Sequence, residues 1–262
     1  MLKAALTRLG RSNAARPLRH LLAPLVSRIA VPVPALLTTS HTCYVDTHSV
    51  IGRGLLVTGA MDPKQAAWIS SAVEGRDGIF IDAGANVGFF SLLALSKMRA
   101  GVAHAFEIDP RTLRCLRMTK ERGKLENFIV HGYGLGEQRA TAGLQAEKEL
   151  GWTHVDFTSA AGPRFDILPL DDFAGEFAGQ RVIAMKMDVE GMELAVARGA
   201  RKLLAEHRPL VVSEAIDVNL ARYGATIQDL IAFMASLDYA ANPLAGTDDP
   251  TIVFTPGTSS TR

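Results

Sequence analysis

The sequence is poor in cysteine and in long apolar runs, and it has no acidic residue before Asp46. Cys43 and Cys115 are the only two cysteines in 262 residues, which excludes a disulfide framework and a CxxC metal motif. A reducing compartment, and with it a cytoplasmic location, is therefore expected. No apolar run approaches the roughly 20 residues that span a bilayer. Four arginines also interrupt the first twenty residues, where a secretory signal needs an apolar core.

What is present is a composition typical of a folded α/β chain, with 48% hydrophobic and 21% charged residues. The net charge is +1, but six of the 28 basic residues and none of the 27 acidic residues precede Asp46. The acidic remainder disfavours nucleic acid as a partner. The basic segment, with Leu2, Leu6 and Leu9 on one helical face, predicts an N-terminal helical arm packed on the body. The alternative is peripheral contact of residues 1–30 with an anionic membrane.

From about residue 61 onward, apolar strands and helices alternate along the chain. Strands are expected at Ile79–Asp82, Val102–Glu107, Phe128–His131, Val182–Asp188, Leu210–Glu214 and Ile252–Phe254. Helices are expected between them, with Asp62, Asp109 and Thr226 as N-caps and Pro63 and Pro110 in the first turn. This alternation predicts a mostly parallel sheet covered by helices on both faces.

Three segments have a less regular pattern. Residues 41–60 are expected to form short strands or a hairpin around Gly52 and Gly54. Residues 137–165 lack a clean period and predict an excursion of loops and short strands. After the fourth strand, one helix is expected to run to about Ala205.

Four of the predicted strands end in an acidic residue: Asp82, Glu107, Asp188 and Glu214. In a parallel sheet these carboxyl ends share one edge, where α/β proteins bind their ligands. One terminal acid carries little information, whereas four on one edge predict a polar cleft.

The loop after the first of these acids is rich in small residues, from Gly84 to Gly88. A dinucleotide fingerprint would place its second and third glycines at Asn86 and Phe89, so a nicotinamide cofactor is the weaker interpretation. Glu107 suits the two hydroxyls of a ribose. A ribose site without a phosphate loop indicates S-adenosylmethionine, whose ammonium suits Asp82 and whose carboxylate suits the loop amides.

These stretches resemble the FkbM family of S-adenosylmethionine-dependent methyltransferases. The matching motifs are FIDAGANVGFFS at 80–91, AFEIDP at 105–110 and, most specific to the family, KMDVEGME at 186–193. Shorter matches are Gly134–Gly136, Leu170–Phe173 and Arg198–Ala200. The resemblance covers about residues 60 to 256. This sequence departs from the family pattern at two positions. Ile108 stands where the family often has proline, and Met192 stands where the family commonly has a small residue.

The resemblance implies a Rossmann-like class I methyltransferase fold with seven strands, the last antiparallel, and methyl transfer mostly to oxygen. The implied acceptor is a hydroxyl of a small molecule, such as a macrolide-type natural product or a saccharide. The expected domains are an accessory segment 1–60, a cofactor-binding domain 61–256 and a disordered tail 257–262. The implied cofactor-binding residues are Asp82, Gly84, Asn86 and Gly88 for the methionine half, Glu107 for the ribose, Ile108 and Leu135 near the adenine, and Asp188.

Transfer to an alcohol gains from a general base, for which Asp188, Glu190 and Glu214 are the candidates. Two alternatives stay open: a Mg²⁺ site formed by these acids, which is not favoured, and a structural role such as pairing of Asp188 with Lys186 on one strand face. A non-catalytic relative and a nicotinamide oxidoreductase are the competing functions.

Other polar residues give weaker signals. His41, Cys43 and His48 lack a fourth ligand at a spacing suitable for zinc, so no metal site is predicted. Trp152 and His154 lie in the 137–165 excursion, where a place in an acceptor pocket is an alternative that is not favoured. Acceptor choice is still expected to depend on residues 1–60 and 137–165.

Overall fold

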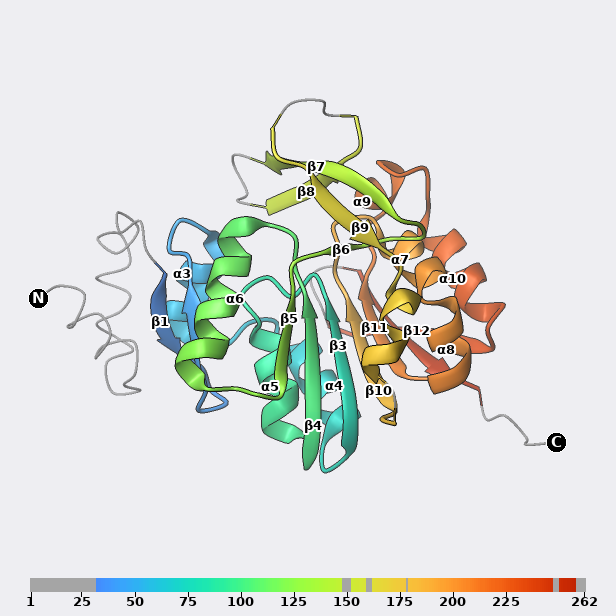
Figure 1. Cartoon of the computed structure of the whole chain (residues 1–262). Coiled ribbons are helices and arrows are strands. Elements are labelled where there is room, and N and C mark those ends of the chain that lie inside the picture. Colours follow the sequence, from blue (N-terminus) through green and yellow to red (C-terminus); the bar gives the residue numbers. More distant parts are fainter. Residues whose placement is uncertain (1–31, 148–151, 159–161, 178, 247–249, 258–262) are drawn as a thin grey trace, which may run out of the picture.

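The computed structural model describes residues 32–147, 152–158, 162–177, 179–246 and 250–257 (Figure 1). Its centre is a seven-stranded sheet in the order β12-β13-β11-β10-β3-β4-β5. The strands are β3 (Asp77–Ala83), β4 (Ala100–Phe106), β5 (Phe128–His131), β10 (Val182–Met187), β11 (Leu210–Glu214), β12 (Tyr239–Pro243) and β13 (Thr251–Pro256). Only β13 runs against the other six. The expected seven-stranded, mostly parallel α/β sheet is confirmed.

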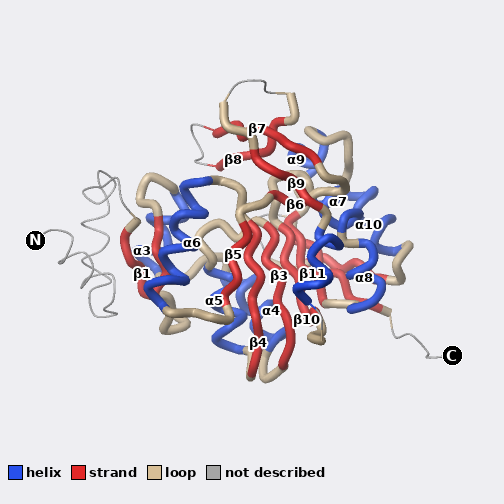
Figure 2. The backbone as a smooth tube through the Cα atoms, viewed as in Figure 1, coloured by secondary structure: helices blue, strands red, loops and turns tan. Residues whose placement is uncertain are grey.

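Helices cover both faces of this sheet (Figure 2). Phe80 points to a core shared with α4 (Pro63–Val73), α5 (Phe89–Lys97) and α6 (Pro110–Gly123). Its neighbours Ile79 and Ile81 point to the opposite core, shared with α7 (Glu193–Gly199), α8 (Arg201–His207) and α10 (Ile227–Ala235). Because successive strand side chains alternate between faces, a continuous apolar run serves both cores.

The helix starts predicted from capping residues are confirmed. The carboxylate of Asp62 accepts a hydrogen bond from the amide of Gln65, and that of Asp109 accepts one from the amide of Arg111. Thr226 forms a reciprocal capping box with the residue three positions later. These contacts are local, which is why the sequence pattern locates them well.

The single helix expected after β10 is two short helices, α7 and α8, separated at Ala200. The second helix begins there because the Asp171 carboxylate accepts hydrogen bonds from the amides of Lys202 and Leu203, each at 3.0 Å. Asp171 belongs to the 3₁₀ helix η2 (Leu170–Phe177), some thirty residues earlier. A cap supplied from so far along the chain leaves no local pattern.

The prediction for residues 41–60 is wrong in its second half. A hairpin does form, between β1 (Val33–Leu36) and β2 (Thr42–Val45), but Gly52 and Gly54 lie within helix α3 (Val50–Thr58). The Ser49 hydroxyl caps this helix by accepting from the Gly52 amide at 2.8 Å. A Cβ at Gly52 would lie 2.0 Å from the Asp46 carbonyl oxygen, so close packing requires this helical glycine.

The proposed accessory segment is joined to the main body. Val33, Cys43 and Leu55 belong to the same apolar cluster as Phe80 of the central sheet, so residue 60 does not separate two cores. The predicted helical arm and the membrane contact of residues 1–30 lie outside the described residues, as does the tail beyond Gly257. None of the helices in the described ranges has the length and apolar character that crossing a membrane requires.

The predicted excursion is a small second sheet. Its order is β6 (Gly134–Leu135), β9 (Phe165–Leu168), β7 (Ala140–Glu147) and β8 (Trp152–Asp156). Strands β7 and β8 form an antiparallel hairpin. Figure 1 places this small sheet at the carboxyl end of the parallel strands, beside the short helix α9 (Asp217–Ala221).

Candidate functional site

Two of the four acids predicted at the strand ends, Glu107 and Asp188, line one cleft. It lies at the carboxyl ends of β3, β4 and β10, where the strand order reverses, with the small sheet and α3 beside it. The predicted residues that line the cleft are Gly84, Asn86, Glu107, Ile108, Leu135, Asp188 and Glu190. Asp82, Gly88 and Glu214 are not among the lining residues.

The glycine loop is shaped by protein contacts. Gly84 has φ +76°, and a Cβ there would lie 1.8 Å from the Asp188 carbonyl oxygen. A Cβ at Gly88, with φ +85°, would lie 2.8 Å from a Leu116 methyl group. We predicted that these glycines bring the backbone close to a ligand. The atoms that exclude a side chain at both positions belong to neighbouring parts of the fold, and the approach to a ligand stays a prediction. Gly84 and Asn86 line the cleft.

Asp82 lies beneath the cleft and is fully buried. The Ser91 hydroxyl donates to it at 2.6 Å, and Lys186 Nζ lies 3.7 Å away. The same ammonium donates to Asp188 at 3.0 Å and to the Gly84 carbonyl at 3.3 Å. The alternative pairing of Lys186 with Asp188 is therefore present. Asp82 contacts Lys186 beneath the cleft. It does not line the cleft, although we predicted that it would.

The charged groups at the base of the cleft are one ammonium, of Lys186, and two carboxylates, of Asp82 and Asp188. Burial lowers the pKa of Lys186, but Asp188 and Asp82 outweigh burial and raise that pKa, so the ammonium stays charged. Burial raises the pKa of Asp82, with Lys186 and Ser91 opposing the shift. The group nearest to the cleft is Asp188, whose side chain is 30% exposed.

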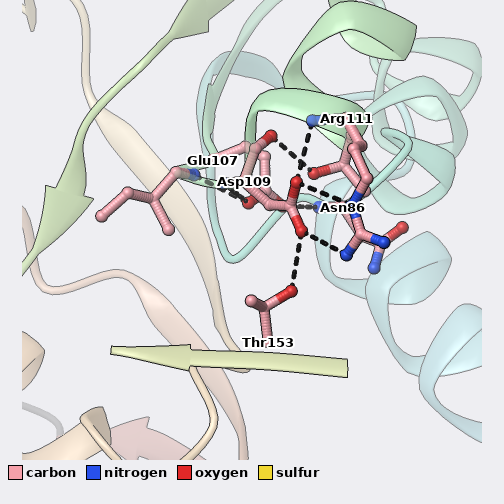
Figure 3. A network of polar contacts seen from close by, with 7 residues as sticks. Asn86, Glu107, Asp109, Arg111 and Thr153 are labelled. Atoms are coloured by element: carbon pink, nitrogen blue, oxygen red, sulfur yellow. Dashed lines mark hydrogen bonds and ion pairs between the residues drawn. The ribbon is translucent and has the colours of Figure 1, made fainter. Parts of the chain in front are cut away.

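Glu107, at the end of β4, is bound by three backbone amides (Figure 3). One carboxylate oxygen accepts from Ile108 at 2.7 Å and from Asp109 at 2.8 Å, and the other accepts from Asn86 at 2.8 Å. Burial raises its pKa to about 7 although these amides favour the ionised form. The second oxygen, with one protein donor, retains capacity to accept a ligand hydroxyl.

A second network of polar contacts, around the Asp109 carboxylate, joins the small sheet to α6 (Figure 3). The Thr153 hydroxyl, on β8, donates to the Asp109 carboxylate at 2.7 Å. The Arg111 guanidinium also donates to that carboxylate, at 2.8 Å. Sequence reasoning identified Asp109 as a helix cap but missed Arg111 and Thr153, which line the cleft. Thr153 lies 44 residues after Asp109, so no local pattern contains their contact.

Glu190 follows β10 with a left-handed backbone, φ +56°. The next residue, Gly191, has φ +106°, and a Cβ there would lie 2.2 Å from the Asn219 carbonyl oxygen. The Asn219 side chain donates to the Glu190 carboxylate at 3.3 Å. Burial, assisted by the charges of Asp188 and Glu193, raises the pKa of Glu190 to about 7. A carboxyl with this pKa is suited to exchange a proton near neutral pH.

Glu214, the third candidate base, does not reach the cleft. The segment after β11 contributes instead through Asn219 in α9, whose side chain donates to the Glu190 carboxylate. Within the described ranges, Asp188, Glu190 and Glu214 do not gather into a group that could share a metal ion. The zinc alternative does not form either: His48 contacts Asp46, and Cys43 is buried in the core.

The remaining walls of the cleft come from the two segments expected to select the acceptor. The N-terminal region contributes Asp46, Ser49, Val50, Ile51 and Met61. The small sheet contributes His154 and its neighbours on β8, whereas the Trp152 side chain lies outside the described part of the chain.

Comparison with known proteins gives one family and several proteins of similar fold. The profile of the Methyltransferase FkbM domain matches residues 82–241. "Methyltransferase 1" of Beauveria bassiana is 27% identical over 164 residues, which cover 54% of this chain and 65% of that protein. The chain thus spans less than two thirds of this curated relative.

Solved structures to which the chain is similar include the following two. The methyltransferase FkbM from Methylobacillus flagellatus KT has 20% identity and a TM-score of 0.49, over 77% of this chain and 52% of that chain. An rRNA methylase from Streptococcus thermophilus has 12% identity and a TM-score of 0.40, over 72% and 91%. The family profile, in contrast, matches more than half of the 262 residues. The chain therefore belongs to the FkbM methyltransferase family.

Proposed function

We propose that this chain binds S-adenosylmethionine in the cleft and transfers its methyl group to a hydroxyl oxygen of a small molecule. One observation carries the proposal: Glu107, held by three backbone amides at the end of β4, and Glu190, which follows β10, line one cleft at the carboxyl edge of the sheet. Burial raises the pKa of both carboxyl groups. Perturbed carboxyl groups that converge in a cleft are typical of binding and catalytic sites.

The cofactor half of the cleft fits the proposed ligand. Glu107 retains acceptor capacity for a ribose hydroxyl, and Ile108 and Leu135 offer apolar surface to an adenine. Asn86 Oδ1 is buried and has no hydrogen-bond partner among the described residues. A ligand donor there would satisfy it. Asp188 replaces the buried Asp82 as the proposed partner of the ligand ammonium.

When bound, S-adenosylmethionine supplies an electrophilic methyl group and a neutral thioether leaving group. The residues of the chain then have to position the acceptor and remove its proton. We assign the proton to the Glu190 carboxylate, which Asn219 orients. Asp188 is a weaker candidate because Lys186 already donates to it at 3.0 Å, and Glu214 is not retained.

The lining of the acceptor half favours an uncharged acceptor with apolar surface. Val50, Ile51 and Met61 offer apolar contacts, while Asp46 and Glu190 contribute negative charge. The Arg111 guanidinium is already engaged by Asp109. This lining disfavours phosphate groups, so we retain a small molecule over nucleic acid, although the fold also occurs in an rRNA methylase. A cytoplasmic location is likewise proposed, and both cysteines are buried free thiols.

Calorimetry with S-adenosylmethionine and with NAD tests the cofactor. We expect one molecule of S-adenosylmethionine and no NAD to bind. Glu107→Ala, or the milder Glu107→Gln, is expected to weaken binding on the order of 10- to 100-fold, as for a lost hydrogen bond to a charged group. Glu126→Ala, which alters an exposed acid, is the control. A folded chain that binds no S-adenosylmethionine would refute the proposal, whereas binding without methyl transfer would indicate the alternative, a non-catalytic relative that keeps the cofactor site.

Transfer of a labelled methyl group to hydroxyl compounds and to RNA tests the acceptor. Methylated RNA would overturn the acceptor class. With an acceptor in hand, Glu190→Gln is expected to lower kcat by about 10²- to 10⁴-fold, the usual contribution of a general base. Full turnover by both Glu190→Gln and Asp188→Asn would show that the acceptor chemistry lies elsewhere.

A further inference from the structure

Two buried histidines and a carboxylate meet behind the ends of β4 and β5. His104 Nδ1 lies 3.0 Å from His131 Nε2, and His131 Nε2 lies 3.8 Å from Glu176 Oε2. One ligand atom from each of the three residues lies within 4.8 Å of the other two. None of the three lines the cleft, and the proposed methyl transfer uses none of them.

We propose that His104, His131 and Glu176 form a site for a divalent transition metal ion, with zinc as its natural occupant. Ligand atoms that surround zinc at about 2.0–2.2 Å lie about 3–4 Å from one another, and the two distances above fall in this range. Two imidazole nitrogens favour zinc and its neighbours over magnesium or calcium, which prefer oxygen ligands. The set of two histidines and one glutamate recurs in zinc sites with an open fourth position.

The burial of the two rings agrees with this assignment. His104 is 3% and His131 is 7% exposed, and their facing nitrogens belong to side chains that the fold holds against each other. Imidazole binds a metal ion in its neutral form, and a buried position favours that form. Lys120 is a positive charge near this pair, and its ammonium donates to the Phe128 carbonyl at 2.6 Å.

The surroundings hold the rings in place and leave one route of entry. Phe106 stacks on His131 with ring centres 4.3 Å apart, and Phe177 contacts His104 edge-on at 5.0 Å. Such a shell fixes the orientation of ligating imidazoles. The Glu176 side chain is 49% exposed, so an ion can enter from its side. The ion would link β4, β5 and η2.

This site adjoins the cofactor half of the cleft. The amide of Glu107 donates to the His131 carbonyl at 3.1 Å, and Phe106 accepts from the Gly84 and Ala85 amides at 3.0 Å. Metal binding would therefore stabilise the strand ends that carry Glu107. The inference does not depend on the identity of the acceptor or on methyl transfer.

Metal titration of the full chain, without an affinity tag and after removal of metal by a chelator, tests the proposal. We expect one Zn²⁺ per chain, a rise in Tm on binding, and a visible ligand-field band when Co²⁺ is used. Because ligand binding to the folded state alone stabilises it, the Tm shift should grow with metal concentration. A chain that binds no Zn²⁺ and no Co²⁺ overturns the proposal.

Matched variants locate the ion. Glu176→Gln alters a half-exposed side chain and keeps the fold, and it is expected to weaken Zn²⁺ binding by on the order of tenfold or more. His131→Asn is expected to abolish the Co²⁺ band, whereas the exposed controls Glu206→Gln and His48→Asn leave it unchanged. If His131→Asn does not fold, Glu176→Gln decides alone: binding equal to that of Glu206→Gln refutes the site.

Discussion

The two halves of the cleft are built in different ways. The cofactor half consists of strand ends joined by backbone contacts, such as the three amides that bind Glu107 and the carbonyl of Asp188 packed against Gly84. Apart from Glu190, which follows β10, the acceptor half consists of segments added at the edge. These are residues 46–61 and the small sheet, which reaches α6 through contacts such as Thr153 with Asp109. Added segments can vary without disturbing the sheet, whereas the strand ends cannot.

The largest contrast is expected between two glycines. Gly84→Ala, in the cofactor half, is expected to lower the free energy of unfolding by more than about 4 kcal/mol or to prevent folding, because its Cβ would meet the Asp188 carbonyl at 1.8 Å. Gly54→Ala, in α3, has nothing within 4 Å of its Cβ and should stabilise by about 0.5–1 kcal/mol. Urea unfolding measures both. A tolerated Gly84→Ala would contradict the distinction drawn between the halves.

Removal of the buried ammonium is expected to have the next largest effect. Lys186→Met leaves Asp82 and Asp188 without their shared partner and should cost about 3–5 kcal/mol of unfolding free energy. Part of this loss should be recovered in acid, because protonation of Asp82 removes a buried charge. Thermal unfolding at several pH values measures this. The exposed Lys202→Met is the control. An equal loss of unfolding free energy in both variants would contradict the role of Lys186 as the shared partner of the two carboxylates.

The pH dependence of stability tests the turn that carries Glu190, because the Glu193 carboxylate accepts hydrogen bonds from the amides of Val189 and Gly191. Burial raises the pKa of Glu193 from 4.5 to about 7 in the folded chain. Between these two pH values the folded state therefore binds a proton that the unfolded chain has lost. The contribution of Glu193 to stability is fully present below pH 4.5 and is lost as pH rises through about 7. Glu193→Gln should remove on the order of 3 kcal/mol of this fall. Urea unfolding on either side of the window measures it, and an unchanged pH slope would contradict the assignment.

The smallest effect is expected where the small sheet joins α6. Thr153→Val removes the hydrogen bond to Asp109 and should cost about 1 kcal/mol of unfolding free energy, while Thr153→Ser keeps it. Because the contact belongs to the acceptor half, the affinity for S-adenosylmethionine should not change. Urea unfolding and calorimetry measure the two quantities. A loss of cofactor affinity in Thr153→Val would show that the halves are coupled.

Local patterns predicted much of the fold. Asp62, Asp109 and Thr226 cap helices as expected, because a cap and its amide lie within three residues of each other. The polar strand β12 has no clear apolar alternation and was visible only through the resemblance to the family. The break at Ala200 was not predictable, because its cap, Asp171, comes from a distant element.

The sequence by itself determined that acids at successive strand ends would meet beside a glycine loop, because parallel strands place their carboxyl ends on one edge. Only the tertiary structure decided which acids reach the cleft. Register places Asp82 directly beside Lys186, which lies about a hundred residues later, so this acid turns to the buried ammonium. Glu107 and Glu190 are held at the cleft by amides and by Asn219, contacts whose partners are fixed by packing between elements.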